Sequence, residues 1–188
     1  MTIFLDVETT GIGSFRPPTQ RIMQLSWIYK QNEFNFFIDD VKEVSPSVPH
    51  DITVEYCQKH GVSWNHAFSI LLSHLQDCDK LVCHNIDFDI SSIAYELKTR
   101  KHKEYCTYKR IIKDMVSSKD LICTMRSTIN VCKLPLSKTA FKFPKLSELY
   151  FHLFGEQPDL QLHDSLNDCK LLQQCYDSLY DSKLLYAS

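Results

Sequence analysis

The stretch that decides the fold is Met1-Thr2-Ile3-Phe4-Leu5-Asp6-Val7-Glu8-Thr9-Thr10-Gly11. Its apolar, β-prone residues predict a buried strand, which Gly11 ends. Because side chains alternate between the two faces of a strand, Asp6 and Glu8 point the same way. An edge strand with a solvated acidic face is an alternative, since acidic residues usually lie in water. The position of both acids in the most apolar part of the N-terminus favours burial instead, where a divalent cation such as Mg²⁺ or Mn²⁺ would neutralise them.

The composition is that of an ordinary globular protein. The 188 residues are 44% hydrophobic and 23% charged, from which we expect one domain spanning residues 1–188. No apolar run is long enough to cross a bilayer, so we expect no membrane partner, and we also expect no signal peptide before the first strand. The eight cysteines form no CxxC pair, and most have apolar neighbours. They predict no zinc ribbon but reduced core thiols in an intracellular protein of the cytoplasm or the nucleus.

The charge of the chain limits how it can bind nucleic acid. A formal net charge of −2 argues against a broad basic surface, but not against a protein that grips a few terminal nucleotides. Residues 98 to 113 are the exception, because they carry seven basic residues and one acid. We interpret this segment as a solvated helical face, with a phosphate-tracking edge as the alternative.

Hydrophobic patterns divide the rest of the chain into strands and helices. We predict strands at residues 21–29, 34–38, 80–83 and 121–123, and helices at 53–60, 67–75, 88–97, 145–154 and 164–180. The turn Lys30-Gln31-Asn32 would make the second and third strands an antiparallel hairpin. The strand that begins at Lys80 follows a long helical crossover and should run parallel to the first. Thr124 is expected to cap the helix that follows the last strand, and residues 133–143 to form an irregular linker.

A second acidic segment follows a buried strand. It reads His84-Asn85-Ile86-Asp87-Phe88-Asp89, and the end of a strand that opens into a helix is where α/β folds place their sites. We expect either Asp87 or Asp89 to be a third acid of the site. The other one would be a helix cap, a position that aspartate favours.

A third segment, His163-Asp164-Ser165-Leu166-Asn167-Asp168, opens the last predicted helix. If both were helical, His163 and Asp168 would lie on different faces, so they reach one site only if His163 lies in the preceding loop. Asp168 is then a fourth acid, and His163 is a base of suitable pKa. A single histidine at a helix start is otherwise more often an exposed cap, an alternative that the three acidic segments together weaken.

These three segments resemble the motifs of the DEDDh (DnaQ-like) 3′–5′ exonucleases, a family that includes polymerase proofreading subunits and TREX-type enzymes. They occur in the family's order, and the resemblance extends from residue 3 to about residue 178. It implies an α/β fold of the ribonuclease H-like exonuclease kind, with a mixed five-stranded sheet in the order 3-2-1-4-5 flanked by helices. Ser165 departs from the family, which usually has alanine there, and we expect little effect because both residues are small.

The resemblance also implies catalytic roles. Asp6, Glu8 and Asp168 would hold one Mg²⁺ or Mn²⁺, while Asp6 would also reach a second ion that Asp89 helps to hold through water. His163 would deprotonate the attacking water. The acid of the second segment is therefore expected to be Asp89 rather than Asp87, and Asp164 is expected to be a bystander.

Further positions would contact the substrate by the same resemblance. Ile12 is a candidate for packing against the terminal base. Asn85 and Phe88 would support the site. The residues expected to contact the terminal nucleotide are Thr9, Thr10, Gly11 and Ile12.

The implied activity is removal of nucleotides from the 3′ end of DNA, single-stranded or frayed, by two-metal-ion hydrolysis with a histidine base. Two alternatives are a 3′–5′ exoribonuclease and a non-catalytic module that binds nucleic acid or protein. Degenerate domains of the last kind usually lose an acid, and here all are present. No polymerase motif occurs, so proofreading would need a polymerase or replication partner. The sequence contains no serine–histidine or cysteine–histidine arrangement for covalent catalysis and no P-loop.

Overall fold

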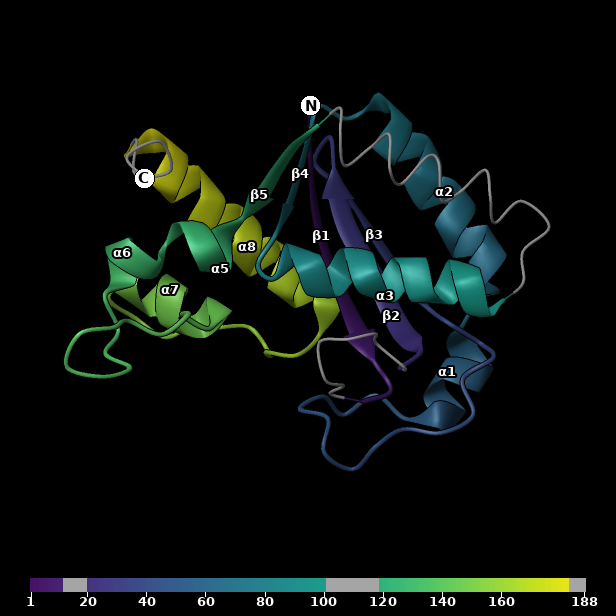
Figure 1. Ribbon diagram of the computed structural model, residues 1–188. Coiled ribbons are helices and arrows are strands. Elements are labelled where there is room, and N and C mark those ends of the chain that lie inside the picture. Colours follow the sequence, from purple (N-terminus) through teal and green to yellow (C-terminus); the bar gives the residue numbers. More distant parts are fainter. Residues whose placement is uncertain (12–19, 101–118, 183–188) are drawn as a thin grey trace.

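A five-stranded sheet forms the centre of the structure, a computed structural model that describes residues 1–11, 20–100 and 119–182 (Figure 1). Its strands are β1 (Thr2–Thr9), β2 (Ile22–Tyr29), β3 (Asn32–Phe37), β4 (Lys80–Cys83) and β5 (Asp120–Cys123). They are ordered β3-β2-β1-β4-β5. The β1–β2 and β2–β3 pairs are antiparallel, whereas β1–β4 and β4–β5 are parallel. This mixed order confirms the prediction from the sequence.

The hairpin between β2 and β3 has a tighter turn than the sequence suggested. Lys30 and Gln31 both adopt the left-handed backbone conformation, with φ of 50° and 64°. Two such residues in a row make the two-residue turn whose twist matches the flanking strands. Asn32, which we had expected in the turn, already pairs with Tyr29. β3 therefore begins two residues earlier than predicted.

Helices cover both faces of the sheet (Figure 1). They are α1 (Val54–His60), α2 (Trp64–Asp77), α3 (Ile86–Thr99), α5 (Thr124–Ser127), α6 (Ile129–Cys132), α7 (Leu146–Phe154) and α8 (Ser165–Asp181). Ile3 and Leu5 of β1 belong to a core shared with α2 and α3, whereas Phe4 packs in a second cluster with α8. Because side chains alternate along β1, Asp6 and Glu8 share the face of Phe4. The two acids therefore point to the side of α8.

Capping residues set where several helices begin and end. The side chains of Thr53, Ser63 and Asp164 each accept a hydrogen bond from a first-turn N–H of α1, α2 and α8, as N-caps do. α2 thus begins at Trp64, three residues before the predicted start. Gly155, with φ of 76°, ends α7 in the left-handed conformation that glycine favours.

The prediction that Thr124 caps a helix is wrong. Cys123 occupies the N-cap position of α5, and Thr124 is the first helical residue. The Thr124 hydroxyl instead lies 3.0 Å from Nδ1 of His84, whose Nε2 donates to the Pro144 carbonyl at 2.9 Å. The Thr124 hydroxyl therefore contacts His84 and does not cap the helix. The linker of residues 133–143 also has some order, because Pro135 pairs with Phe141 in a β-bridge.

The structure also bears on the predictions for the cysteines, for membrane spans and for the basic segment. The seven described cysteines are all buried and unpaired. Among the described helices, none is both long and apolar enough to cross a bilayer. Ile12 and the basic residues from Lys101 to Lys113 lie outside the described residues. Arg100, the last described residue of the basic segment, is not a solvated charge, because it binds the carboxylates of Glu96 and Asp40.

Candidate active site

Two acids from β1 form the floor of the candidate site. Glu8 is buried and Asp6 is partly buried, on the face of the sheet toward α8. Burial, reinforced by the charges of Asp168, Asp164 and Asp89, raises the pKa of Glu8 to about 8. Burial, followed by the charges of Asp89 and Asp168, also raises the pKa of Asp6 well above its ordinary value. The strand has thus brought together carboxylates that repel one another.

Asp89 joins this group from the first turn of α3. Its side chain is buried, and burial raises the pKa of the carboxyl to about 8, although hydrogen bonds with the Val7 backbone and the Cys83 thiol oppose the rise. Asp87 points elsewhere, because it is exposed and forms an ion pair with Arg126. The structure therefore places Asp89, the acid that the family resemblance favoured, with the other acids, and not Asp87.

The expectation that the remaining acid caps α3 is wrong. Asn85 occupies the N-cap position, and both Asp87 and Asp89 lie inside the first turn. The Asn85 side chain makes no capping hydrogen bond. Phe88, the other residue expected to support the site, is partly buried and packs against the core between the sheet and α3.

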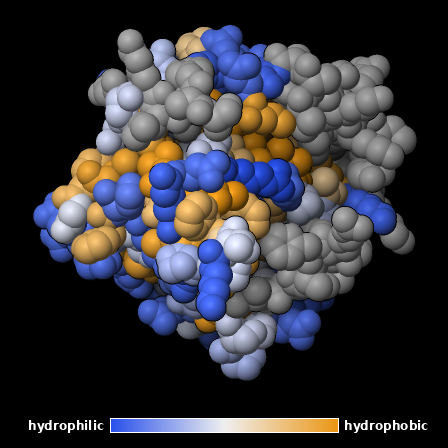
Figure 2. All heavy atoms as spheres, turned by 60° about the vertical axis from the view of Figure 1, so that its left-hand side comes forward, coloured by the Kyte–Doolittle hydropathy of each residue, from blue (hydrophilic) through white to orange (hydrophobic). Residues whose placement is uncertain are grey.

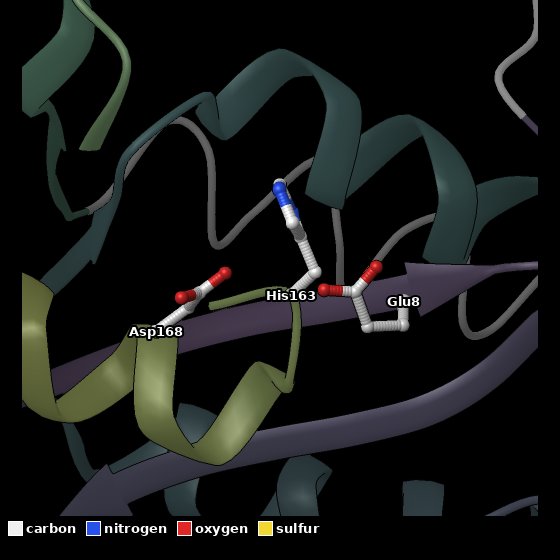
Figure 3. Close-up of side chains that lie close together, drawn as sticks. All are labelled: Glu8, His163 and Asp168. Carbon is white, nitrogen blue, oxygen red and sulfur yellow. The ribbon is translucent and has the colours of Figure 1, made fainter. Parts of the chain in front are cut away.

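The third segment completes the cluster from the start of α8. Asp164 caps the helix, so His163 lies in the loop before it, with a left-handed φ of 61°. In this position one ligand atom each of Glu8, His163 and Asp168 lies within 4.8 Å of the other two. Figure 3 shows the imidazole rising between the two carboxylates. His163 thus lies in the loop before the helix, which is the position from which the sequence allowed it to reach one site together with Asp168.

The titration of Asp168 and His163 reflects this setting. Burial raises the pKa of Asp168 to about 7, although a hydrogen bond with the His163 backbone opposes the rise. Burial, followed by the positive charge of Lys145 and then that of His50, lowers the pKa of His163. Near neutral pH the imidazole is therefore uncharged and able to accept a proton.

A buried polar network, which sequence reasoning missed, fixes the start of α8 on β2. Gln24 donates to the Asp164 carboxylate at 2.9 Å and accepts from the Ser165 N–H at 3.1 Å. The Ser165 and Ser26 hydroxyls are 2.6 Å apart, and Ser26 also donates to Asn35 of β3. Gln24, Ser26 and Ser165 are all fully buried. The sequence does carry a signal, because Gln24 and Ser26 interrupt an apolar strand at a spacing of two.

The end of β1 borders a cavity of about 390 Å³. Thr9 is buried, and its hydroxyl donates to the Gly11 carbonyl at 2.8 Å. His50, a second residue that sequence reasoning missed, donates from Nε2 to the Thr9 carbonyl at 2.8 Å. Of the residues predicted to contact a nucleotide, Thr10 and Gly11 line the cavity, together with Gln20, Glu43, Val44, Ser45 and Ser47.

The donor set of the cluster fits divalent cations. Within the described part of the chain, Asp6, Glu8, Asp89 and Asp168 form no ion pair with a lysine or arginine. Oδ1 of Asp168 is buried and has no hydrogen-bond partner among these residues. Buried carboxylates without a counter-charge are costly, and hard cations such as Mg²⁺ prefer oxygen ligands of this kind.

The sheet order, with helices on both faces, defines the ribonuclease H-like exonuclease fold. The sequence matches no family model and no curated protein. A solved structure of a full-length 3′-exonuclease is similar, with a TM-score of 0.59 and 15% identity over 97% of this chain and 61% of the other. Cell-death related nuclease 4 is similar with a TM-score of 0.53 and 11% identity, over 96% of this chain and 64% of the other. The chain thus spans less than two thirds of either neighbour, and at these identities the likeness is one of fold.

Proposed function

We propose that the protein is a metal-dependent 3′–5′ exonuclease, a phosphodiester hydrolase that removes nucleotides from the 3′ end of DNA. The observation that carries the proposal is the convergence of Glu8, His163 and Asp168, whose ligand atoms lie within 4.8 Å of one another. Asp6 and Asp89 add two further carboxylates that interact electrostatically with this group. The similar solved structures, a 3′-exonuclease and a nuclease, support the assignment.

The four acids are proposed to hold two Mg²⁺ or Mn²⁺ ions. Asp6, Glu8 and Asp168 would ligate one ion, and Asp6 with Asp89 would hold the other. When bound, such ions neutralise the charge of the phosphate and stabilise the leaving 3′-oxygen. The free oxygen of Asp168 and the absence of a counter-charge at all four acids within the described residues support these assignments.

His163 is proposed as the general base. Its side chain is exposed at the edge of the acidic cluster, where a water can reach it. Because the pKa of the imidazole is lowered, the ring is neutral at physiological pH and takes the proton of the attacking water. A positioned base of this kind typically contributes about 10²- to 10⁴-fold to the rate.

The terminal nucleotide is proposed to bind where β1 ends. Thr10 and Gly11 line the cavity there, and the bonds of Thr9 with Gly11 and His50 hold its rim. Ile12 follows directly in the sequence and is proposed to pack on the base. Asn85 and Phe88 are proposed to support the site from the start of α3. The acidic cluster would serve DNA and RNA alike, so the two substrates are compared directly in the test.

The test uses 5′-labelled single-stranded DNA and RNA oligonucleotides with Mg²⁺ or Mn²⁺. We expect a ladder that shortens from the 3′ end, and no cleavage with chelator or in the Asp89→Asn variant. Asp87→Asn is the matched control, because Asp87 lies in the same helical turn but pairs with Arg126 at the surface. Equal activity of Asp89→Asn and the unchanged protein would overturn the proposal. Binding of both oligonucleotides without cleavage would make the protein a non-catalytic module.

A further inference from the structure

A strip of exposed side chains runs toward the candidate site from residue 141 to residue 145. Along this segment the exposed residues are Phe141, Phe143 and Lys145, while Lys142 is half-buried and Pro144 is buried. Lys142 turns inward to form an ion pair with Glu148 of α7 at 2.5 Å. Exposed and less exposed residues thus alternate along the segment, so the two phenyl rings and the Lys145 side chain all reach the surface.

The rings of this strip are more exposed than core residues would be. Phe141 is 44% exposed and Phe143 is 53% exposed. Leu136, on the other arm of the same small hairpin, is also exposed. The hairpin is held by the Pro135–Phe141 bridge and by the bond from the Lys142 N–H to the Leu134 carbonyl at 2.9 Å. The exposed rings are therefore carried by an ordered backbone.

The charge around the strip is positive. Residues 133–147 contain four lysines and no acid. Lys133, Lys138 and Lys145 are exposed, and none of them forms an ion pair with another described residue. Figure 2 turns this side of the molecule forward and shows apolar and hydrophilic residues mixed on the part of the face that is coloured. Aromatic side chains between lysines suit a flexible polyanion whose bases can stack, whereas an apolar protein partner would leave the lysines without counter-charge.

The last two residues of the strip lie near the segments that carry the candidate site. The Pro144 carbonyl accepts a hydrogen bond from His84, which directly follows β4 and precedes the start of α3. Lys145, at the end of the strip, is close enough to His163 for its charge to affect that residue. A hollow of about 550 Å³, lined by Lys145, Glu148 and Phe151 among others, extends the surface over α7. A chain held on the strip would thus lead into the site.

We propose that the strip of Phe141, Phe143 and Lys145 binds single-stranded nucleic acid on the 5′ side of the scissile phosphate, with bases stacked on the two rings. Lys138 and Lys145 contact the phosphates. The proposal rests on the proposed function, because the 5′ side of the strand lies on the strip only if its 3′ end lies in the candidate site. It predicts that substrates of several nucleotides bind more tightly than a dinucleotide, which fills the site alone.

The first experiment compares hydrolysis of a dinucleotide with that of 12-residue oligothymidylate and oligouridylate. The double variant Phe141→Ala/Phe143→Ala should raise KM for the 12-mers roughly five-fold or more, as loss of base stacking does, without raising it for the dinucleotide. Tyr56→Ala is the matched control, because Tyr56 is 46% exposed on α1 at the far end of the molecule (Figure 1). An equal rise in KM for both substrate lengths would overturn the proposal.

A second experiment measures binding without catalysis, by fluorescence anisotropy of a labelled 12-mer in chelator. The Phe141→Ala/Phe143→Ala variant should bind at least about five-fold more weakly. Lys138→Ala should lower the slope of log K against log salt by roughly 0.7, the value for one phosphate of a single strand, and Lys59→Ala should leave the slope unchanged. Unchanged binding by the double variant would overturn the proposal and leave the strip to a protein partner. If the protein binds 12-mers through the strip but cleaves nothing, only the proposed function fails.

Discussion

At the scale of single residues, His163 combines an unusual backbone conformation with a lowered pKa. Its left-handed φ of 61° costs energy for a residue with a Cβ. This conformation places the imidazole between Glu8 and Asp168 and lets the next residue, Asp164, serve as the N-cap of α8. The sequence predicted that His163 would lie in a loop. It did not predict the backbone angle that brings the ring to the acids, because that angle follows from where α8 is held.

We expect His163→Gln to lower kcat by about 10²- to 10⁴-fold, since a positioned base is lost. The lowered pKa means that the neutral form persists at pH 7 and is lost only below the ordinary value of 6.5. The pH profile of kcat for the unchanged protein should therefore fall on the acid side, and this limb should be missing in His163→Gln. His152→Gln on α7 is the control. An identical acid limb in the two proteins would contradict the role of His163.

Burial of the acids, reinforced by their mutual repulsion, should make the metal-free protein less stable as pH rises. The pKa of Asp168 is raised from 3.8 to about 7, so the folded state holds this proton more tightly than the unfolded chain. That contribution is complete below pH 3.8 and is lost as pH rises through 7, and Glu8 extends the loss to about pH 8. In chelator, Asp168→Asn should therefore raise Tm at pH 8 and raise it less at pH 5.

Divalent cations should reverse this loss of folding stability at high pH. Mg²⁺ should raise the Tm of the unchanged protein at pH 8 more than at pH 5, and it should raise that of Asp168→Asn less. Asp87→Asn, which removes an exposed acid outside the cluster, should respond to Mg²⁺ like the unchanged protein. Thermal melts with Mg²⁺ and with chelator measure both effects. A Tm of Asp168→Asn that lies below that of the unchanged protein in chelator at pH 8 would contradict the account.

At the scale of elements, the placement of α8 depends on polar contacts with β2. Gln24 bonds with Asp164, Ser165 and Asn35. Ser165→Ala removes one hydroxyl and leaves Ser26 with a partner in Asn35, so we expect a loss of about 1 kcal/mol in the free energy of unfolding. Gln24→Leu leaves the buried Ser165 N–H without its acceptor and removes the donor to the partly buried Asp164 carboxylate, each at a cost of about 1–3 kcal/mol.

Urea unfolding measures this difference between the two variants. Gln24→Leu should also lower kcat, because the loop of His163 loses its anchor, whereas Ser165→Ala should retain most of the activity. A Gln24→Leu protein as stable and as active as Ser165→Ala would show that the network does not position α8.

The elements also show which features the sequence could predict and which it could not. The spacing of Asp6 and Glu8 is a local property of a strand, so the shared face could be predicted. The residue pattern alone left Asp87 and Asp89 open and only the family resemblance favoured Asp89, because the pairing that holds Asp87 at the surface joins it to Arg126 across 39 residues. The contacts of Gln24 with Asp164 and Ser165 join positions about 140 residues apart. The cap assigned to Thr124 failed for the same reason, because a distant histidine takes its hydroxyl.

At the scale of the whole molecule, one buried ionic network joins three parts of the fold. The fully buried carboxylate of Glu96 on α3 accepts bonds from Arg21, Arg100 and the Ile22 N–H at 2.7–3.0 Å. Arg100 in turn holds Asp40, in the segment after β3, through both of its terminal nitrogens. The network thus ties the start of β2 to the end of α3 and to the loop that leads toward the cavity.

Glu96→Gln should destabilise the fold by up to about 3–5 kcal/mol, because it removes the buried counter-charge of two partly buried arginines and leaves them only the exposed Asp40. Lys142→Met is the comparison, since the Lys142–Glu148 pair lies closer to the surface and should cost no more than about 1 kcal/mol. Chemical denaturation measures both. A Glu96→Gln protein that loses no more stability than Lys142→Met would show that the network is not needed to hold these parts together.

The buried thiols beside the acids can report when the candidate site opens. Cys83 contacts Asp89, and Cys169 lies close to Asp6. Both are fully buried, and burial raises the pKa of each thiol well above its ordinary value, so neither reacts while the site is closed. Alkylation must wait for the strand ends and α8 to separate. The rate of alkylation at these two positions, measured by mass spectrometry, therefore reports how often the region opens. Ligands that hold the region closed should lower this rate.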